Sequence, residues 1–200
     1  ESVANADGFF AEGKSAYLVD ATTGRELYAK NENERLPVAS MVKLMTVLLT
    51  LEAEERGELS YDEDITVSER AASMGGSQIF LDAGSVHKAG DLLKSVIIAS
   101  ANDSCVALAE RIGGSVEGFV ESMNARAREL GMQNTNFANC TGLPAAEGFS
   151  SARDMAVLLK KVCTHPEYYG YAGVWLEDYT HPGGRTTTMT NTNKLVRFYD

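Results

Sequence analysis

The sequence is short of cysteine, histidine and positive charge, and each shortage excludes a class of protein. Its three cysteines are an odd number without the paired spacing of a zinc site. The three histidines lie far apart in loop-like contexts, so no metal site is predicted. With 18 Lys and Arg against 28 Asp and Glu, the net charge is −10 and the pI about 4.8. Such a charge argues against nucleic acid or an anionic membrane as a partner.

Long apolar runs are also missing. No stretch approaches the roughly 20 residues that a transmembrane helix needs, and no signal peptide is recognisable. We interpret the chain as beginning after a leader that has been removed or that was left out of this sequence. Hydrophobic residues make up 44% of the sequence, which is enough to bury the core of one compact domain over residues 1–200.

Hydrophobic periodicity and turn residues predict a hairpin followed by helices, which is typical of an α+β domain. Strands are expected at residues 15–20, 26–30 and 185–190. Helices are expected at residues 40–56, 90–99, 104–112, 115–130 and 151–163. Ser151 and Asp154 form a capping arrangement at the start of the last helix. Cys105 and Cys163 fall in helical patterns and are predicted to be small core residues.

Lys43 is a lone charge in the apolar helical stretch from Met41 to Leu51. Hydrophobic side chains surround this stretch on every side, which is typical of a helix in a protein interior. Burial lowers the pKa of an unpaired ammonium and favours the neutral amine. A neutral lysine one turn after Ser40 can accept the hydroxyl proton and make Ser40 a nucleophile. Because Ser40 begins the helix, free amides and the helix dipole favour an anion beside it.

Short motifs occur by chance, and the chain holds two that we do not expect to be functional. Ser85 and Lys88 repeat the Ser-x-x-Lys spacing, but their polar surroundings between Gly84 and Gly90 are typical of a solvated loop. Residues 8–15 match the phosphate-loop pattern Gly-x4-Gly-Lys-Ser. That loop needs a buried strand before it and a helix after it, whereas here a short polar segment precedes and a strand and turn follow.

Ser100 and Asn102 form a second motif, Ser-x-Asn, at the break between two predicted helices. At such a break both side chains can face a cleft, although Asn102 can instead serve only as a cap of the second helix. The same pattern at Ser122 and Asn124 falls inside a predicted helix, where it has no reason to face a site. Ser100 and Asn102 are therefore the candidates to join Ser40 and Lys43.

The two motifs, in this order, resemble those of serine penicillin-recognising enzymes. Their flanking segments are similar to D-alanyl-D-alanine carboxypeptidases, the low-molecular-mass penicillin-binding proteins; these segments are residues 36–46, 76–81, 100–107, 134–137, 142–143 and 150–155. The resemblance runs from about Ala16 to the end of the chain. It implies a penicillin-binding-protein/β-lactamase-like fold, in which a helical cluster packs on an antiparallel sheet.

The resemblance also implies the chemistry. Ser40 would be acylated, Lys43 would be the base, and Ser100 with Asn102 would relay protons and hold the substrate amide. The reaction would remove the terminal D-alanine from peptidoglycan stem peptides in cell-wall remodelling, without a cofactor, and β-lactams would acylate the same serine. The protein would be exported, at the cell surface or in the periplasm of a bacterium, with any membrane attachment through segments absent from this chain. Two alternatives stay open: a serine β-lactamase, and a non-catalytic sensor of β-lactams or muropeptides.

One expected motif is missing. The family's third motif, Lys-Thr-Gly or Lys-Ser-Gly, lies on a sheet edge that pairs with the substrate and supplies an oxyanion-hole amide. These 200 residues do not contain it. We therefore expect the third-motif lysine and the last strands of the sheet to lie beyond Asp200, and the chain to be inactive alone. A second polypeptide would then supply the strands, or copies of the chain would exchange them.

Overall fold

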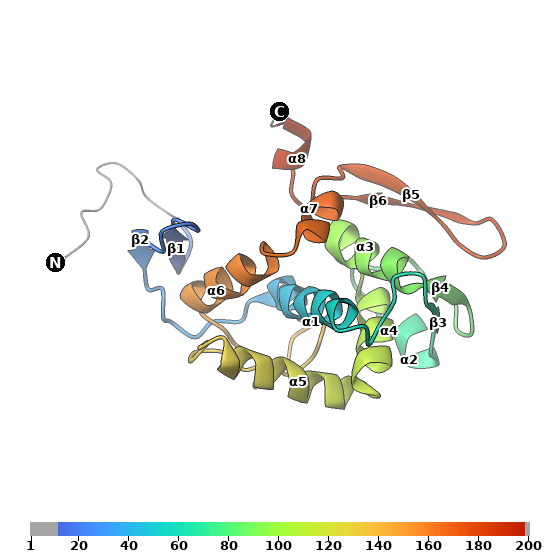
Figure 1. Cartoon of the computed structure of the whole chain (residues 1–200), viewed down its shortest axis with the longest axis horizontal. Helices are drawn as coiled ribbons and strands as arrows, with labels where there is room; N and C mark the ends of the chain where they lie inside the picture. The colour runs from blue at the N-terminus through green and yellow to red at the C-terminus, as the bar shows by residue number, and fades with distance from the viewer. Residues whose placement is uncertain (1–11, 199–200) are drawn as a thin grey trace.

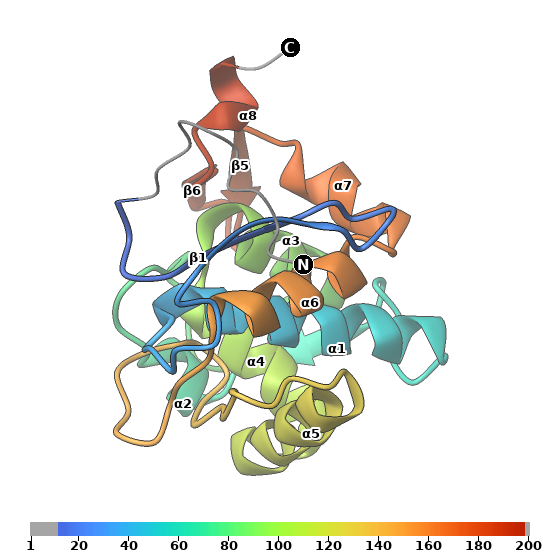
Figure 2. The ribbon, with the colours of Figure 1, turned by 90° about the vertical axis from the view of Figure 1, so that its left-hand side faces the viewer.

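Helix α1 (Lys43–Glu55) forms the centre of the fold, and a 3₁₀ turn, η1 (Ala39–Val42), leads into it. The computed structural model describes residues 12–198. Around α1 lie four helices, α3 (Ala89–Ala99), α4 (Asn102–Gly113), α5 (Val116–Glu129) and α6 (Ala152–Val162) (Figures 1 and 2). The predicted buried helix over residues 40–56 is confirmed, with its first turn wound as a 3₁₀ helix.

The side chains of α1 explain its central place. Leu48 and Leu51 are almost fully buried, and they belong to a hydrophobic core to which all the surrounding helices contribute. Two threonine side chains on α1 are fully buried too, and both make hydrogen bonds. Thr46 Oγ1 donates to Cys140 O (2.8 Å) and Thr50 Oγ1 donates to Thr46 O (2.8 Å). The helix can therefore be enclosed without leaving these hydroxyls unpaired.

The strands of residues 12–198 form three separate two-stranded antiparallel sheets. β1 (Ala16–Val19) pairs with β2 (Glu26–Lys30), with Ala16 opposite Lys30, and this hairpin packs against α6. β3 (Asp64–Thr66) pairs with β4 (Val86–Lys88), and β5 (Leu176–Thr180) with β6 (Thr186–Thr190). In Figure 1 the first and last hairpins lie on opposite sides of the helical cluster. Helices and antiparallel strands together confirm the predicted α+β class.

Several short elements were not predicted, because tertiary contacts rather than periodicity order them. They are β3, β4, β5, α2 (Glu69–Ala72), α7 (Pro166–Ala172) and α8 (Leu195–Phe198). β3 and β4 have three residues each, too few for a period to show. The prediction of a solvated loop at residues 85–88 is wrong for 86–88, which pair as β4, with Lys88 in an ion pair with Asp64. No helix among residues 12–198 is long and apolar enough to cross a membrane.

The capping arrangement predicted at the start of α6 is present in part. Ser151 Oγ accepts a hydrogen bond from Asp154 N (3.2 Å), as predicted. The Asp154 carboxylate does not close a capping box, because it accepts from Asn134 N (2.8 Å) and so connects α6 to the segment after α5. Arg153 pairs with Glu26 of β2 (2.8 Å), which ties the first hairpin to α6.

His87 and His181 lie side by side although they are far apart in the sequence. Both are buried, and their ring centroids are 5.9 Å apart. Tyr179 Oη lies 2.6 Å from His87 Nδ1, and Ser85 Oγ lies 2.8 Å from His87 Nε2. Because Ser85 donates its own hydrogen to Asp82 O (2.5 Å), His87 donates from Nε2. A neutral His87 can then accept a hydrogen bond from Tyr179 Oη at Nδ1.

We expect acidification to destabilise the contact between β4 and the β5–β6 hairpin. Burial lowers the pKa of both histidines; for His87 the neighbouring His181 lowers it further, and for His181 the neighbouring Arg185 does so. Three carboxylates act in the opposite direction without reversing the shift, namely Asp82, Asp91 and Asp103. As the pH falls, the unfolded chain therefore takes up protons at these histidines before the folded chain does. The stability that the neutral histidines contribute is complete above their ordinary pKa of about 6.5 and is lost as the pH falls below it.

The measurement is thermal unfolding at a series of pH values between about 7.5 and 5. The midpoint should fall by a few degrees on acidification, and less so in the His87→Gln, His181→Gln double variant. An equal fall in both proteins would show that other groups cause the pH dependence.

Candidate active site

Ser40 and Lys43 lie together at the start of the central helix. Ser40 is exposed in η1, whereas Lys43, the first residue of α1, is only 4% exposed. Lys43 Nζ lies 3.1 Å from Ser40 Oγ and donates a hydrogen bond to Thr141 O (2.6 Å). The predicted spacing therefore places an amine beside an accessible hydroxyl.

The protonation state of Lys43 follows from its surroundings. Burial lowers the pKa of Lys43, and two buried thiols, Cys105 and Cys140, oppose the shift without cancelling it. Both thiols are free, and Cys105 Sγ donates to Cys140 O (2.9 Å). In its neutral form the amine can donate to Thr141 O and still accept the proton of Ser40. The arrangement is that of a nucleophile with an adjacent general base.

The carbonyl that orients Lys43 belongs to a tight turn over residues 139–143. Asn139 Oδ1 organises this turn by accepting from Thr141 N (3.1 Å) and Gly142 N (2.7 Å), while its Nδ2 donates to Leu143 O (2.9 Å). Asn139 and Thr141 were not predicted as site residues. Only the adjoining Gly142 and Leu143 stood out in the sequence, as part of the family resemblance, and no local pattern indicates a contact with Lys43 that spans 98 residues.

The same turn presses against the residue before the nucleophile. Ala39 has φ of +47°, a left-handed conformation that is uncommon for a residue with a side chain. Gly142 has φ of +82°, and a Cβ at this position would lie 1.9 Å from Ala39 O. Only glycine allows this approach of the two backbones. Strain at Ala39 and close packing at Gly142 together determine where Ser40 is held.

Ser100 joins Ser40 and Lys43 at one cavity of about 340 Å³. Ser100 ends α3 with φ of +57°, again left-handed, which turns the chain sharply before α4. The other side chains that line this cavity are Met41, Leu44, Val47, Val96, Ile97, Leu159, Tyr168 and Thr192. The cavity thus has a polar end at the candidate catalytic groups and an otherwise largely apolar wall.

Asn102 lies beside this region but does not line the cavity. It is the first residue of α4 and its side chain makes no capping hydrogen bond, so the alternative that it serves only as a cap is wrong. Its Nδ2 donates to Gly75 O (2.7 Å), and its backbone N donates to Ser77 O (2.7 Å). In the part of the chain that the structure describes, its buried Oδ1 has no hydrogen-bond partner. A buried acceptor of this kind is suited to receive an N–H from a ligand.

The third-motif lysine expected beyond Asp200 has no counterpart in this site. Asp200 itself lies outside the described residues, which end at Phe198. The expectation that a substrate-binding lysine follows Asp200 therefore stays a prediction. Of the four predicted catalytic candidates, the structure places Ser40, Lys43 and Ser100 at the cavity, with the 139–143 turn against Lys43, while Asn102 lies outside the cavity lining.

The motifs set aside in the sequence have other surroundings. Ser122 and Asn124 lie within α5, where Ser122 Oγ donates to Gly118 O (3.1 Å) and Asn124 Nδ2 donates to Phe137 O (2.8 Å). Residues 8–11 of the phosphate-loop pattern lie outside the described residues, and strand β1 rather than a helix follows Ser15. Among residues 12–198, no cluster of three or more His, Cys, Asp or Glu side chains is placed to hold a metal ion.

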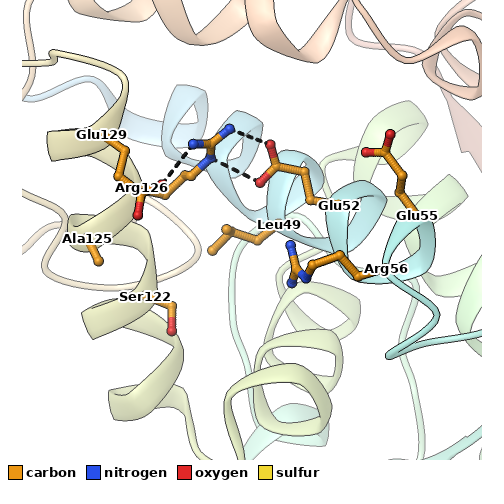
Figure 3. Close-up of a pocket in the computed structure, with 8 residues that line it drawn as sticks. All are labelled: Leu49, Glu52, Glu55, Arg56, Ser122, Ala125, Arg126 and Glu129. Carbon is orange, nitrogen blue, oxygen red and sulfur yellow. Dashed lines mark hydrogen bonds and ion pairs between the residues drawn. The ribbon is translucent and has the colours of Figure 1, made fainter.

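A second hollow, of about 470 Å³, lies between α1 and α5 (Figure 3). Arg126 of α5 crosses to Glu52 of α1 and makes two hydrogen bonds to its carboxylate, at 3.0 and 2.7 Å. Figure 3 shows this guanidinium held between the carboxylates of Glu52 and Glu129. The residues that line this hollow are all different from those that line the cavity at Ser40. We interpret the hollow as a structural contact that fixes α5 to the far half of α1.

Known proteins are similar to this chain over nearly its whole length. Residues 3–200 match the protein family described as D-alanyl-D-alanine carboxypeptidase. The chain belongs to this family. The D-alanyl-D-alanine carboxypeptidase DacF of Bacillus subtilis is 46% identical over 189 residues, which are 94% of this chain and 48% of DacF. DacC of Escherichia coli is 39% identical over 166 residues, covering 79% of this chain and 41% of DacC. The chain thus spans about half the length of these D-alanyl-D-alanine carboxypeptidases.

Solved structures of the family share the fold. The D-alanyl-D-alanine carboxypeptidase DacD from Francisella tularensis superposes with a TM-score of 0.93 at 26% identity, covering 100% of this chain and 60% of that one. Penicillin-binding protein 6B from Escherichia coli superposes with a TM-score of 0.84 at 35% identity, covering 93% of this chain and 58% of that one. The predicted penicillin-binding-protein fold is therefore confirmed.

Proposed function

We propose that the protein is a serine D-alanyl-D-alanine carboxypeptidase, which removes the terminal D-alanine from peptidoglycan stem peptides outside the bacterial cytoplasm. One observation carries the proposal: the buried amine of Lys43, with its lowered pKa, lies 3.1 Å from the exposed hydroxyl of Ser40. Membership of the D-alanyl-D-alanine carboxypeptidase family supports the substrate class. Such a reaction would contribute to cell-wall remodelling and cell shape, and β-lactams would be covalent inhibitors.

In the proposed reaction, Ser40 Oγ attacks the carbonyl carbon of the scissile amide while its proton passes to Lys43 Nζ. The oxyanion forms beside the Ser40 amide, near the start of the central helix. Breaking the C–N bond releases D-alanine, whose nitrogen takes up the proton with Ser100 Oγ as relay. Water then hydrolyses the Ser40 ester and restores the hydroxyl. Asn102 Oδ1 accepts the N–H of the substrate amide, and no cofactor takes part.

We further propose that residues 1–200 belong to one transpeptidase-like domain whose third-motif lysine lies beyond Asp200, since these residues do not contain it. The apolar wall of the Ser40 cavity supports this proposal, because strands that pack on it would also present a sheet edge to the substrate. The domain would be exported, with any membrane attachment through segments outside this chain. The partner of the site is then a peptide ending in D-Ala-D-Ala, and not a nucleic acid.

A serine β-lactamase is the nearest alternative, and one sequence feature argues against it. Class A β-lactamases use a Glu-x-x-x-Asn element after the second motif, in which the glutamate activates the water for deacylation. No such element occurs between residues 104 and 190. A sensor on the same fold would be acylated but would not turn over any peptide.

We therefore expect a long-lived penicilloyl-enzyme together with turnover of a D-Ala-D-Ala peptide. The measurement compares the decay of a fluorescent penicillin adduct with D-alanine release, on the intact protein that contains these residues. Mass spectrometry should place the adduct on the Ser40 peptide; an adduct on the Ser85 peptide would contradict the assignment of the nucleophile. Rapid, repeated hydrolysis of penicillin would instead identify a β-lactamase. Stable acylation without any D-alanine release would identify a sensor.

A further inference from the structure

The chain between α2 and β4 contains a loop, residues 75–82, that holds Asn102 in place. Asn102 binds this loop through backbone carbonyls. Its Nδ2 donates to Gly75 O and its backbone N donates to Ser77 O, each at 2.7 Å. The direction of the Asn102 side chain therefore depends on the backbone path of the 75–82 loop.

Asp103, the next residue along α4, fixes that path from the interior. It is 0% exposed, and its carboxylate accepts from Ile79 N at 3.2 Å and from Leu81 N at 3.1 Å. It also accepts from Ser104 N (2.9 Å) in its own helix, where the N-terminal dipole favours a negative charge. A buried carboxylate is costly unless it is hydrogen-bonded, and the amides of the 75–82 loop supply much of what this one needs.

The 75–82 loop has a conformation that requires such support. Phe80, between the two bound amides, has φ of +63°, which is a strained region for a bulky side chain. Gly76 has φ of +78°, and a Cβ there would lie 2.9 Å from Asn102 Nδ2. Without the carboxylate that binds Ile79 N and Leu81 N, relaxation of Phe80 would move the carbonyls that orient Asn102.

The contacts that the β5–β6 hairpin makes with the 75–82 loop use carbonyls of the loop, whereas Asp103 binds its amides. Arg185 Nη2 donates to Phe80 O (2.5 Å) and Thr187 Oγ1 donates to Ile79 O (3.1 Å), both from the β5–β6 hairpin. These bonds use carbonyls of the loop, and Arg185 is exposed. Asp103 binds its amides in the core, directly after Asn102 in the same helix.

We propose that Asp103 is a positioning residue for Asn102, acting through the amides of Ile79 and Leu81. This inference rests on the proposed carboxypeptidase function, because it assigns Asp103 a part in how Asn102 meets the substrate amide. Asp103 itself touches no substrate. Its carboxylate sets the path of the 75–82 loop, and the loop carbonyls set the direction of the Asn102 carboxamide.

The test is a double-mutant cycle between Asp103→Asn and Asn102→Ala, on the intact protein that contains these residues. In Asp103→Asn, an NH₂ group replaces one acceptor oxygen and faces donors. We expect the single variant to lower kcat/KM for a D-Ala-D-Ala peptide about 10- to 100-fold. The loss in Asp103→Asn should be divided between kcat and KM in the same way as the loss in Asn102→Ala. In the Asn102→Ala background, Asp103→Asn should cost less than about twofold.

Matched variants separate positioning from general damage to the fold. Asp82→Asn removes a carboxylate from the exposed end of the same loop, where it pairs with Arg185, and should leave kcat/KM unchanged. Gly76→Ala pushes against Asn102 Nδ2 without removing a charge, so its loss of activity should largely disappear in Asn102→Ala. If Asp103→Asn does not fold, as judged by circular dichroism, Asp103→Glu takes its place in the cycle.

The outcomes are distinct. Equal losses from Asp103→Asn with and without the Asn102 side chain, or no loss at all, would overturn the positioning role. A wild-type protein that neither binds penicillin nor releases D-alanine would overturn the proposed function instead. Even in a protein without activity, NMR can test whether Asp103 positions Asn102. The Asn102 side-chain amide resonances should shift in Asp103→Asn and not in Asp82→Asn. Unchanged resonances in both variants would contradict the proposal without any activity measurement.

Discussion

Replacing Lys43 by Arg should abolish acylation of Ser40 by penicillin and by substrate. The amine at this position is buried with a lowered pKa, so that at working pH a neutral fraction can take the Ser40 proton. A guanidinium keeps its proton in any protein site and therefore cannot act as the base. Loss of a general base costs about 10²- to 10⁴-fold in rate. The measurement is the second-order rate of labelling by a fluorescent penicillin.

Lys88→Arg is the matched control for this prediction. Lys88 follows Ser85 with the same spacing, but it is exposed and pairs with Asp64 (2.6 Å) at the surface. Its replacement should leave labelling unchanged. Wild-type labelling should also rise with pH through the lowered pKa of Lys43, since only the neutral amine is a base. Rapid labelling of Lys43→Arg, or a labelling rate in the wild type that does not depend on pH, would contradict the role of Lys43.

Replacing Gly142 by Ala should strongly destabilise the protein and slow acylation together. The new Cβ would lie 1.9 Å from Ala39 O and 3.0 Å from Ser40 N, and the backbone has φ of +82°. Overpacking against backbone and an unfavourable φ together predict a loss of about 2–4 kcal/mol in the free energy of unfolding. Because the displaced atoms belong to Ala39 and Ser40, the nucleophile should move as well. Urea unfolding and penicillin labelling measure the two effects.

Gly131→Ala is the control, because Gly131 has φ of +75° but no atom within 4 Å of the added Cβ. It should cost only about 1 kcal/mol, which is the cost of the backbone conformation alone. Labelling of Ser40 should not change in this variant. If Gly142→Ala were no less stable than Gly131→Ala, close packing of the 139–143 turn against Ala39 would not be what holds Ser40.

The parts of the site that could be predicted from the sequence are those that depend on neighbours along the chain. Ser40 and Lys43 are three residues apart at a helix start, so helical geometry alone brings them together. The apolar surroundings of Lys43 indicated burial, and its pKa is lowered as expected. Ser100 was predicted at a helix break, and the left-handed turn at this residue explains why α3 ends there.

The prediction was wrong or silent where partners come from distant segments. Asn102 was predicted as a site residue, with a cap as the alternative, and nothing in the sequence indicated that its side chain would bind Gly75 O, 27 residues away. The acceptor for Lys43 is Thr141 O, which no local pattern marks. His87 and His181 were placed in loops, and only the packing of the β5–β6 hairpin brings them together.

By itself, the sequence determined the central helix, the α+β class and the pair Ser40–Lys43, because helix periodicity and a three-residue spacing are local properties. Only the tertiary structure decided how that pair is held. The Thr141 carbonyl, the contact of Gly142 with Ala39, and the Asp103 carboxylate beneath the 75–82 loop all join segments that are far apart in the chain. Buried polar groups must find hydrogen-bond partners wherever the fold supplies them, and no local pattern encodes which segment that is.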